Sequence, residues 1–262
     1  LTIAFQKLLS IILYKNTVSV RSIFEMTIIR TPSNTLEPTT DKGYSHPTNI
    51  QGIEKLLHGN PNLWRGCDMA GQGFHGRSTG FPQLDDILPG RGWPQSGLIE
   101  IITPCWGMGE LQLLIPLMRS VIEQGKWILW IAPPYLLYAP ALVQAGIDTD
   151  QVLVVKRETS CKDALWSMEK ALQTSNCGLV LAWQNWLPGK VLRRLQLAAE
   201  TGNTLGVLFK HSDSKHSPSP IRLQIKDCPS KGGDFSTAEV TVIKARGNFR
   251  PLTTQINLYP HN

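Results

Sequence analysis

Residues 103–110 have the glycine-rich composition of a phosphate-binding loop, but they lack the side chains that such a loop needs. A phosphate loop joins a strand to a helix, and its backbone N–H groups cradle the phosphates. A lysine reaches the β- and γ-phosphates, and a serine or threonine holds magnesium. Thr103 and Gly107 belong to the turn, and ungapped spacing places Gly109 and Glu110 at the lysine and hydroxyl positions. Because a carboxylate repels a triphosphate, we predict a degenerate loop that holds no cofactor and no metal.

Two interpretations of this loop are open. Its N–H groups lie at the start of a helix predicted over residues 110–124, where they could still bind phosphate. Alternatively, the loop is a tight turn that the fold requires, and Glu110 favours the helix dipole while it opposes an anion. We favour the second interpretation, because it accounts for an acidic residue at this position.

The composition is typical of a folded chain with one substantial core. Of the 262 residues, 42% are hydrophobic and 18% are charged, which argues against a disordered chain. The net charge of +6 is compatible with a nucleic acid or an acidic protein partner, and equally with ordinary surface lysines and arginines. The five cysteines are widely spaced and form no Cys-x-x-Cys pair, so we predict no disulfide framework, no zinc site and a cytoplasmic location.

The N-terminal segment differs from the rest of the chain. The chain begins at Leu1, and the first methionine is Met26. Residues 2–14 are largely apolar, but the run is too short to span a bilayer and no signal-peptide cleavage site follows it. We therefore expect no membrane anchor and a working protein that begins at Met26, and we leave open whether residues 1–25 are translated.

Composition and hydrophobic pattern divide the chain into four parts. We expect a flexible leader over residues 1–50, of which residues 27–50 are rich in Thr, Ser, Pro and Asn, and a helix with a connection over 51–77. Residues 78–210 form the predicted core. Residues 211–262 form a predicted loop followed by strands at the edge of the sheet.

Short apolar runs alternate with helix-length segments across the core. The predicted buried strands are 98–102, 127–132, 152–155, 178–183 and 204–209. The predicted helices are 110–124, 139–146, 162–172 and 190–201. This alternation predicts an α/β fold whose sheet is mostly parallel and flanked by helices. Later strands at 221–225, 240–243 and 252–259 are expected to add to its edge in antiparallel fashion.

The segment before the degenerate loop resembles the RecA-type recombinases. Residues 78–101 match, without gaps, the Gly/Pro-rich segment that leads into their first core strand. In working RecA-type ATPases a glutamate after the second core strand activates water, and an aspartate at the end of a later strand holds magnesium. The matching positions are Pro133 and Ala182 or Trp183. The resemblance therefore implies a RecA-like fold that has lost its catalytic residues and is not an enzyme.

A second set of motifs gives a narrower resemblance. These motifs lie in residues 109–114, 130–142, 145–148, 162–166 and 193–200. Together they are similar to ImuA, the RecA-like accessory protein of bacterial damage-inducible mutagenesis cassettes. The resemblance implies a non-catalytic adaptor in SOS-induced translesion DNA synthesis. Its implied partners are RecA, an ImuB-like polymerase homologue and an error-prone DNA polymerase.

Two alternatives to the adaptor are open. ImuA belongs to a broader family with SulA, the SOS cell-division inhibitor that binds FtsZ, and residues 257–261 resemble the C-terminal end of SulA. SulA proteins are shorter and lack the 78–100 segment, so ImuA is the better fit. A further alternative is an ATPase that uses an unrecognised site.

Basic and aromatic residues are the remaining candidates for contacts. Two basic groups are candidates for weak DNA contact or partner contact, although solvated surfaces explain them equally well: Lys190, Arg193 and Arg194 in one, and Lys244, Arg246 and Arg250 in the other. The Pro133–Tyr135 turn should lie at the carboxyl end of a strand and suits protein contact. Four tryptophans are expected in the core, Trp127, Trp130, Trp166 and Trp183. Four others are expected in contact loops, Trp64, Trp93, Trp106 and Trp186.

Overall fold

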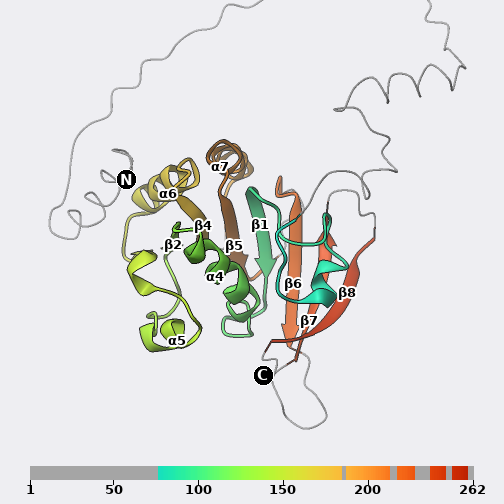
Figure 1. The fold of residues 1–262 in the computed structure, drawn as a ribbon. Helices are drawn as coiled ribbons and strands as arrows, with labels where there is room; N and C mark the ends of the chain where they lie inside the picture. Colours follow the sequence, from blue (N-terminus) through green and yellow to red (C-terminus); the bar gives the residue numbers. More distant parts are fainter. Residues whose placement is uncertain (1–75, 185–186, 213–216, 228–236, 246–249, 259–262) are drawn as a thin grey trace, which may run out of the picture.

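A computed structural model describes residues 76–184, 187–212, 217–227, 237–245 and 250–258. The predicted leader and almost all of the 51–77 segment lie outside the described residues. The described strands form one eight-stranded sheet in the order β3-β2-β4-β5-β1-β6-β7-β8 (Figure 1). They are β1 (Gly97–Ile102), β2 (Trp127–Ile131), β3 (Val152–Val155), β4 (Cys177–Trp183), β5 (Leu205–Lys210), β6 (Ile221–Asp227), β7 (Thr237–Lys244) and β8 (Leu252–Asn257).

The direction of the strands confirms the predicted fold class. Strands β1 to β5 pair in parallel, and their bounds agree with the predicted strands to within one residue. β1, β4 and β5 are buried along their whole length, as expected for strands covered on both faces. β7 and β8 add in antiparallel fashion near the C-terminus.

The prediction was only partly right for β6, which pairs with β7 in antiparallel fashion but with β1 in parallel fashion. Its alternating sequence is typical of a half-exposed strand, which favoured the antiparallel interpretation. In the structure Arg222, one of its polar residues, is only 5% exposed, because it pairs with a buried carboxylate on β1. A buried ion pair therefore replaces the apolar contact that a parallel strand usually makes on this face.

Helices cover both faces of the sheet. α6 (Cys161–Leu172) and α7 (Gly189–Gly202) bury Met168, Leu195 and their neighbours against one face. α3 (Pro82–Asp85) and α4 (Ile115–Glu123) pack into the core of the other face. α5 (Ala139–Gln144) has no buried residue and lies toward the lower edge of the molecule in Figure 1. In the described part of the chain, no helix has the length and apolar character that crossing a membrane requires.

The helix after the degenerate loop begins later than predicted. A 3₁₀ turn, η2 (Gln112–Leu114), comes first, and α4 then begins at Ile115 with Pro116 in its first turn. Proline fits there because the first N–H groups of a helix have no intrahelical partner. Glu110 therefore lies in the loop, and the dipole argument for this residue does not apply.

Candidate functional site

The carboxylate of Glu110 accepts hydrogen bonds from the backbone of its own degenerate loop. Glu110 is 3% exposed, and its two carboxylate oxygens accept hydrogen bonds from the Gly107 N–H at 2.9 and 3.1 Å. In a phosphate loop such an N–H faces the phosphate. Here the carboxylate takes the place of the anion. This arrangement agrees with a structural turn, and phosphate binding by the loop stays untested.

Gly109 leaves no room for the missing lysine. Its φ of +91° lies in the region that L side chains rarely adopt, and a Cβ atom there would lie 2.1 Å from Leu258 Cδ1. Leu258 follows β8 and is 6% exposed, so the C-terminal segment fills the space beside the loop. A side chain at position 109 would displace this buried leucine.

The other loop residues are held by contacts that do not need a ligand. The Thr103 hydroxyl donates to the Cys105 carbonyl at 2.7 Å. The Trp106 ring lies on the His211 ring with centroids 3.8 Å apart, and His211 Nδ1 is 3.1 Å from the Thr103 carbonyl oxygen. These contacts join the loop to the residue that follows β5, so both segments have a defined position without nucleotide.

An apolar groove lies beside this loop at the carboxyl ends of β2 and β4. Its volume is about 230 Å³. Its lining comes from the loop, from the ends of the two strands, from the β2–α5 connection and from α5: Gly107, Glu110, Leu111, Trp130, Pro133, Pro134, Tyr135, Leu136, Leu137, Tyr138, Ala141, Leu142 and Trp183. The crevice at the carboxyl ends of parallel strands is where α/β proteins bind their ligands.

Three of the positions that the RecA resemblance predicts as altered line this groove: Glu110 at the hydroxyl position, Pro133 at the position of the base, and Trp183 as one of the two candidates for the metal-ligand position. Gly109, at the lysine position, and Ala182, the other candidate, do not line it. In the described part of the chain, no group of three or more His, Cys, Asp or Glu side chains is placed to hold a metal ion. The sequence predicted each of these changes separately, and the structure places Glu110, Pro133 and Trp183 around one groove.

Exposed apolar side chains extend the groove at its rim. Tyr135, Leu136 and Tyr138 are 68%, 99% and 71% exposed, respectively. A contiguous set of exposed aromatic and aliphatic side chains beside a groove is typical of a protein-binding surface. The predicted role of the Pro133–Tyr135 turn in protein contact stays a prediction, and the burial pattern supports it.

Aromatic rings form the floor of the groove. Trp130 and Trp183 are 5.3 Å apart between centroids, and Trp183 stacks on Phe209 at 4.7 Å. Both tryptophans are buried, as predicted, but they also line the groove. Trp93 corrects another prediction, because it is fully buried rather than exposed in a contact loop. Of the other predicted contact tryptophans, Trp64 and Trp186 lie outside the described residues.

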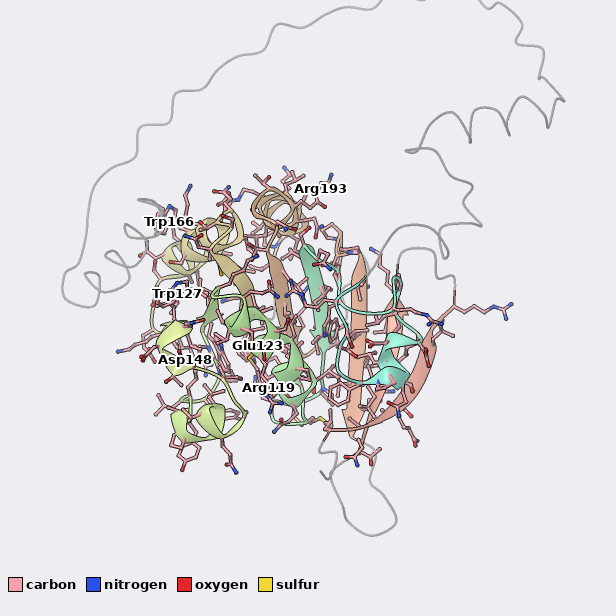
Figure 2. All side chains as sticks on the ribbon, in the orientation of Figure 1. Arg119, Glu123, Trp127, Asp148, Trp166 and Arg193 are labelled. Atoms are coloured by element: carbon pink, nitrogen blue, oxygen red, sulfur yellow. The ribbon has the colours of Figure 1, made fainter. Side chains whose placement is uncertain are left out.

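The predicted basic residues lie on separate elements. Lys190 and Arg193 are exposed on α7, whereas Arg194 Nε lies 3.3 Å from Glu169 Oε2 on α6. Figure 2 shows Arg193 at the upper edge of the molecule, opposite the edge that carries α5. This position separates the α7 residues from the groove.

The second basic group is spread around the β7–β8 connection. Lys244 Nζ donates to the Ser217 carbonyl at 2.9 Å, and Arg250 is exposed before β8. Arg246 lies outside the described residues. DNA or partner contact by either basic group stays a prediction.

Sequence reasoning missed a buried charge cluster around Glu100. One carboxylate oxygen of this fully buried residue accepts hydrogen bonds from Lys210 Nζ at 2.8 Å and Ser217 Oγ at 2.6 Å. The other oxygen lies 3.1 Å from Arg222 Nε. Burial raises the pKa of Glu100, but the hydrogen bonds and charges of these partners outweigh it and hold the pKa below its usual value. The signal was visible in the sequence as one acid within the apolar run 98–102.

This cluster ties the C-terminal strands to the core. It joins β1, β5 and β6 with the segment that precedes β6. None of its residues lines the groove. Cys177 offers no nucleophile either, because burial raises the pKa of its thiol to about 12.

The fold and the groove define a class of protein: an α/β protein with a mostly parallel sheet and an apolar groove at the carboxyl ends of its strands. Residues 106–206 match the family model described as cell division inhibitor SulA. This segment runs from the degenerate loop through β4 and α7 into β5, and it contains every residue that lines the groove. It is therefore a SulA-like segment, which confirms the broader part of the predicted resemblance.

Two curated relatives carry the same description, cell division inhibitor SulA. The protein from Photorhabdus laumondii is 34% identical over 102 residues, which cover 39% of this chain and 57% of the relative. The protein from Serratia marcescens is 35% identical over 99 residues, 38% of this chain and 58% of the relative. The chain thus spans little more than half the length of these relatives.

A crystal structure of SulA from Pseudomonas aeruginosa was also found. It shares 24% sequence identity with a TM-score of 0.36, and the match covers 44% of this chain and 98% of that chain. The family match and the two curated relatives support the SulA alternative more directly than the adaptor. The narrower resemblance to ImuA stays a prediction.

Proposed function

We propose that this chain is a non-catalytic, protein-binding protein of the SulA type, and that it inhibits cell division in the SOS response by binding FtsZ. The observation that carries the proposal is the convergence of Glu110, Pro133 and Trp183 on one apolar groove. Such a groove lacks the groups that stabilise phosphoryl transfer, but it suits the burial of apolar side chains. The match of residues 106–206 to cell-division inhibitors supports FtsZ as the partner.

Polymerisation of purified FtsZ with GTP tests this proposal. We expect the chain to bind FtsZ and to lower the amount of sedimentable polymer in proportion to its concentration. The proposal fails if the polymer is unchanged at a several-fold molar excess of the chain.

A second candidate is the adaptor in translesion DNA synthesis, with RecA, an ImuB-like protein and an error-prone DNA polymerase as partners. The observation that favours it is the extent of the fold outside the SulA-like segment. α3 and β1 precede this segment and β6 to β8 follow it, yet their residues belong to the same sheet and the same core. Residues 78–101, which resemble RecA-type recombinases, also lie outside it.

Binding to purified RecA, to an ImuB-like protein and to FtsZ in parallel separates the two candidates. Binding to RecA and the ImuB-like protein without binding to FtsZ supports the adaptor. Binding to FtsZ alone supports the inhibitor. The cytoplasmic location expected from the sequence is part of both proposals.

A further inference from the structure

The last described residues lie at the same edge of the sheet as the groove. β6 runs parallel to β1, and β7 and β8 each reverse the direction, so β8 ends at the edge where β1 ends. β2 and β4 also run in the direction of β1, and the groove at their carboxyl ends therefore lies at this edge too. It is the lower edge in Figure 1, where α5 also lies.

Leu258 fixes the end of the described chain beside the loop that forms one wall of the groove. It is 6% exposed, and a Cβ atom added at Gly109 would lie 2.1 Å from its Cδ1 atom. Gly107, Glu110 and Leu111 line the groove, and each is within two residues of Gly109. The chain bends at Leu258, so the alternation of side chains along β8 does not continue past it.

The residues that follow Leu258 are close enough to reach this wall. They are residues 259–262, Tyr-Pro-His-Asn, and they lie outside the described residues. Four residues span up to about 13–14 Å, whereas neighbouring Cα atoms of the loop are about 3.8 Å apart. A side chain tethered this close to a site has an effective concentration on the order of millimolar, so a weak contact is enough to hold it there.

We propose that residues 259–262 place the ring of Tyr259 in the groove, where it covers the site until a partner protein displaces it. This inference rests on the proposed protein-binding function and adds its regulation. A tyrosine suits an open apolar groove, because its ring is apolar and its hydroxyl group can stay in water. Glu110 is the one carboxylate among the described residues that line the groove, and it already accepts from the Gly107 N–H.

The size of the groove agrees with an occupant of one side chain. Its volume of about 230 Å³ is smaller than the roughly 300–1,000 Å³ of typical small-molecule sites. A nucleotide-sized ligand is therefore less suitable than a single ring. The exposed side chains of Tyr135, Leu136 and Tyr138 remain at the rim, where a partner makes its first contact before it displaces the ring.

Photo-crosslinking within the full chain tests the position of this side chain. The crosslinker p-benzoylphenylalanine replaces Tyr259, and the products are mapped by peptide mass spectrometry. We expect crosslinks within one molecule to residues 130–142, which contain most of the groove lining. The same crosslinker at Leu252, 42% exposed at the start of β8, should not reach them. Crosslinks from position 259 that miss the groove, or that join two copies of the chain, would overturn the inference while the proposed function stands.

The affinity for purified FtsZ tests whether the ring competes with a partner. Tyr259→Ala should strengthen binding about threefold to tenfold, because covered molecules lower the apparent affinity by the fraction that is open. Tyr259→Phe keeps the ring and is the matched control, with no such gain. Unchanged affinity in Tyr259→Ala would overturn the competition. Crosslinks in the groove without FtsZ binding by any variant would keep Tyr259 as the occupant and reject FtsZ as the partner.

Discussion

At the scale of single residues, Glu110 and Gly109 stabilise the degenerate loop in different ways. Glu110 provides an internal anion that satisfies the Gly107 N–H. Gly109 allows Leu258 to pack where a lysine side chain would begin. The loop therefore combines the loss of a positive charge with the gain of packing and a hydrogen bond. Reversing either change alone does not recreate a nucleotide site.

Gly109→Ala tests the packing of Leu258 against this loop. Gly107→Ala is the matched control, because the two glycines have φ values of +91° and +90° but only Gly109 has an atom within contact distance of an added Cβ. Both variants carry the conformational cost of a side chain at positive φ. We expect Gly109→Ala to lose about 1–3 kcal/mol more than Gly107→Ala in urea unfolding, because it also overpacks the site. Equal losses would contradict the contact with Leu258.

Glu100→Gln tests the buried charge cluster. The variant leaves Lys210 and Arg222 without their buried counter-charge, and we expect a loss on the order of 3–5 kcal/mol. Because the folded pKa of Glu100 is lowered, its contribution is present above an unfolded pKa of about 4.3 and is lost as the pH falls through the folded value. The free energy of unfolding, measured in urea, should therefore fall more between neutral and acid pH in wild type than in the variant.

The control for this measurement is Glu123→Gln on the exposed side of α4, which is labelled in Figure 2. We expect it to change stability by less than about 0.5 kcal/mol. If Glu100→Gln behaves like this control, the cluster does not hold β6 to the core.

At the scale of elements, the β2–α5 connection and α5 differ from the rest of the fold. α5 has no buried residue, and the connection before it exposes two tyrosines and Leu136. Every other helix of more than one turn in the described residues buries an apolar face against the sheet. The exposed element therefore contributes little to the core, and its apolar side chains are available for a partner.

Leu136→Asp tests whether the β2–α5 connection contributes to the stability of the fold. Because Leu136 is 99% exposed, we expect the free energy of unfolding to change by less than about 0.5 kcal/mol. Leu197→Asp on α7, where the leucine is 47% exposed, serves as a control far from the groove. A large loss of stability in Leu136→Asp, measured by urea unfolding, would show that the connection belongs to the core.

Local pattern was sufficient for the buried elements and insufficient where distant residues meet. The runs that became β1 to β5 are short and apolar, and burial on both faces makes such strands recognisable. β6 pairs with β1 in parallel fashion, and its Arg222 contacts Glu100 on β1, which is far away in the sequence. The apolar spacing predicted a helix from residue 110, but α4 begins at Ile115. Pro116 lies in its first turn, and this local signal for a helix start was not used in the prediction.

At the candidate site, too, single positions could be predicted from the sequence, but the contacts between distant segments could not. Each altered position was visible in the sequence, because the resemblance fixed where a lysine, a glutamate and an aspartate should stand. The groove was not visible, because it forms only when the ends of β2 and β4 meet the loop and α5. The predicted exposure of Trp93 was wrong for a related reason. Trp93 lies in a loop, but it forms an isolated β-bridge with the distant Arg77 and is fully buried.

At the scale of the whole molecule, a mostly parallel sheet carries an apolar groove at the carboxyl ends of β2 and β4. We expect no magnesium-dependent ATP hydrolysis above the buffer rate. The double variant Gly109→Lys/Glu110→Thr should not restore it, because Pro133 and Trp183 supply neither a base nor a metal ligand. Phosphate release by the pure chain is the measurement, and hydrolysis that changes in this double variant would instead support an ATPase.

The central claim is that the apolar groove binds a protein partner. Its most direct test is the affinity of the full chain for purified FtsZ, with RecA and an ImuB-like protein measured in parallel, in wild type, Leu136→Asp and Leu197→Asp. We predict that wild type binds FtsZ, that Leu136→Asp weakens binding at least tenfold, and that Leu197→Asp binds like wild type. If Leu136→Asp instead weakens binding to RecA or to the ImuB-like protein, the partner is that protein and the groove is still supported as the binding site. Binding of any of the three proteins that is unaffected by Leu136→Asp, or no binding at all, would contradict the claim.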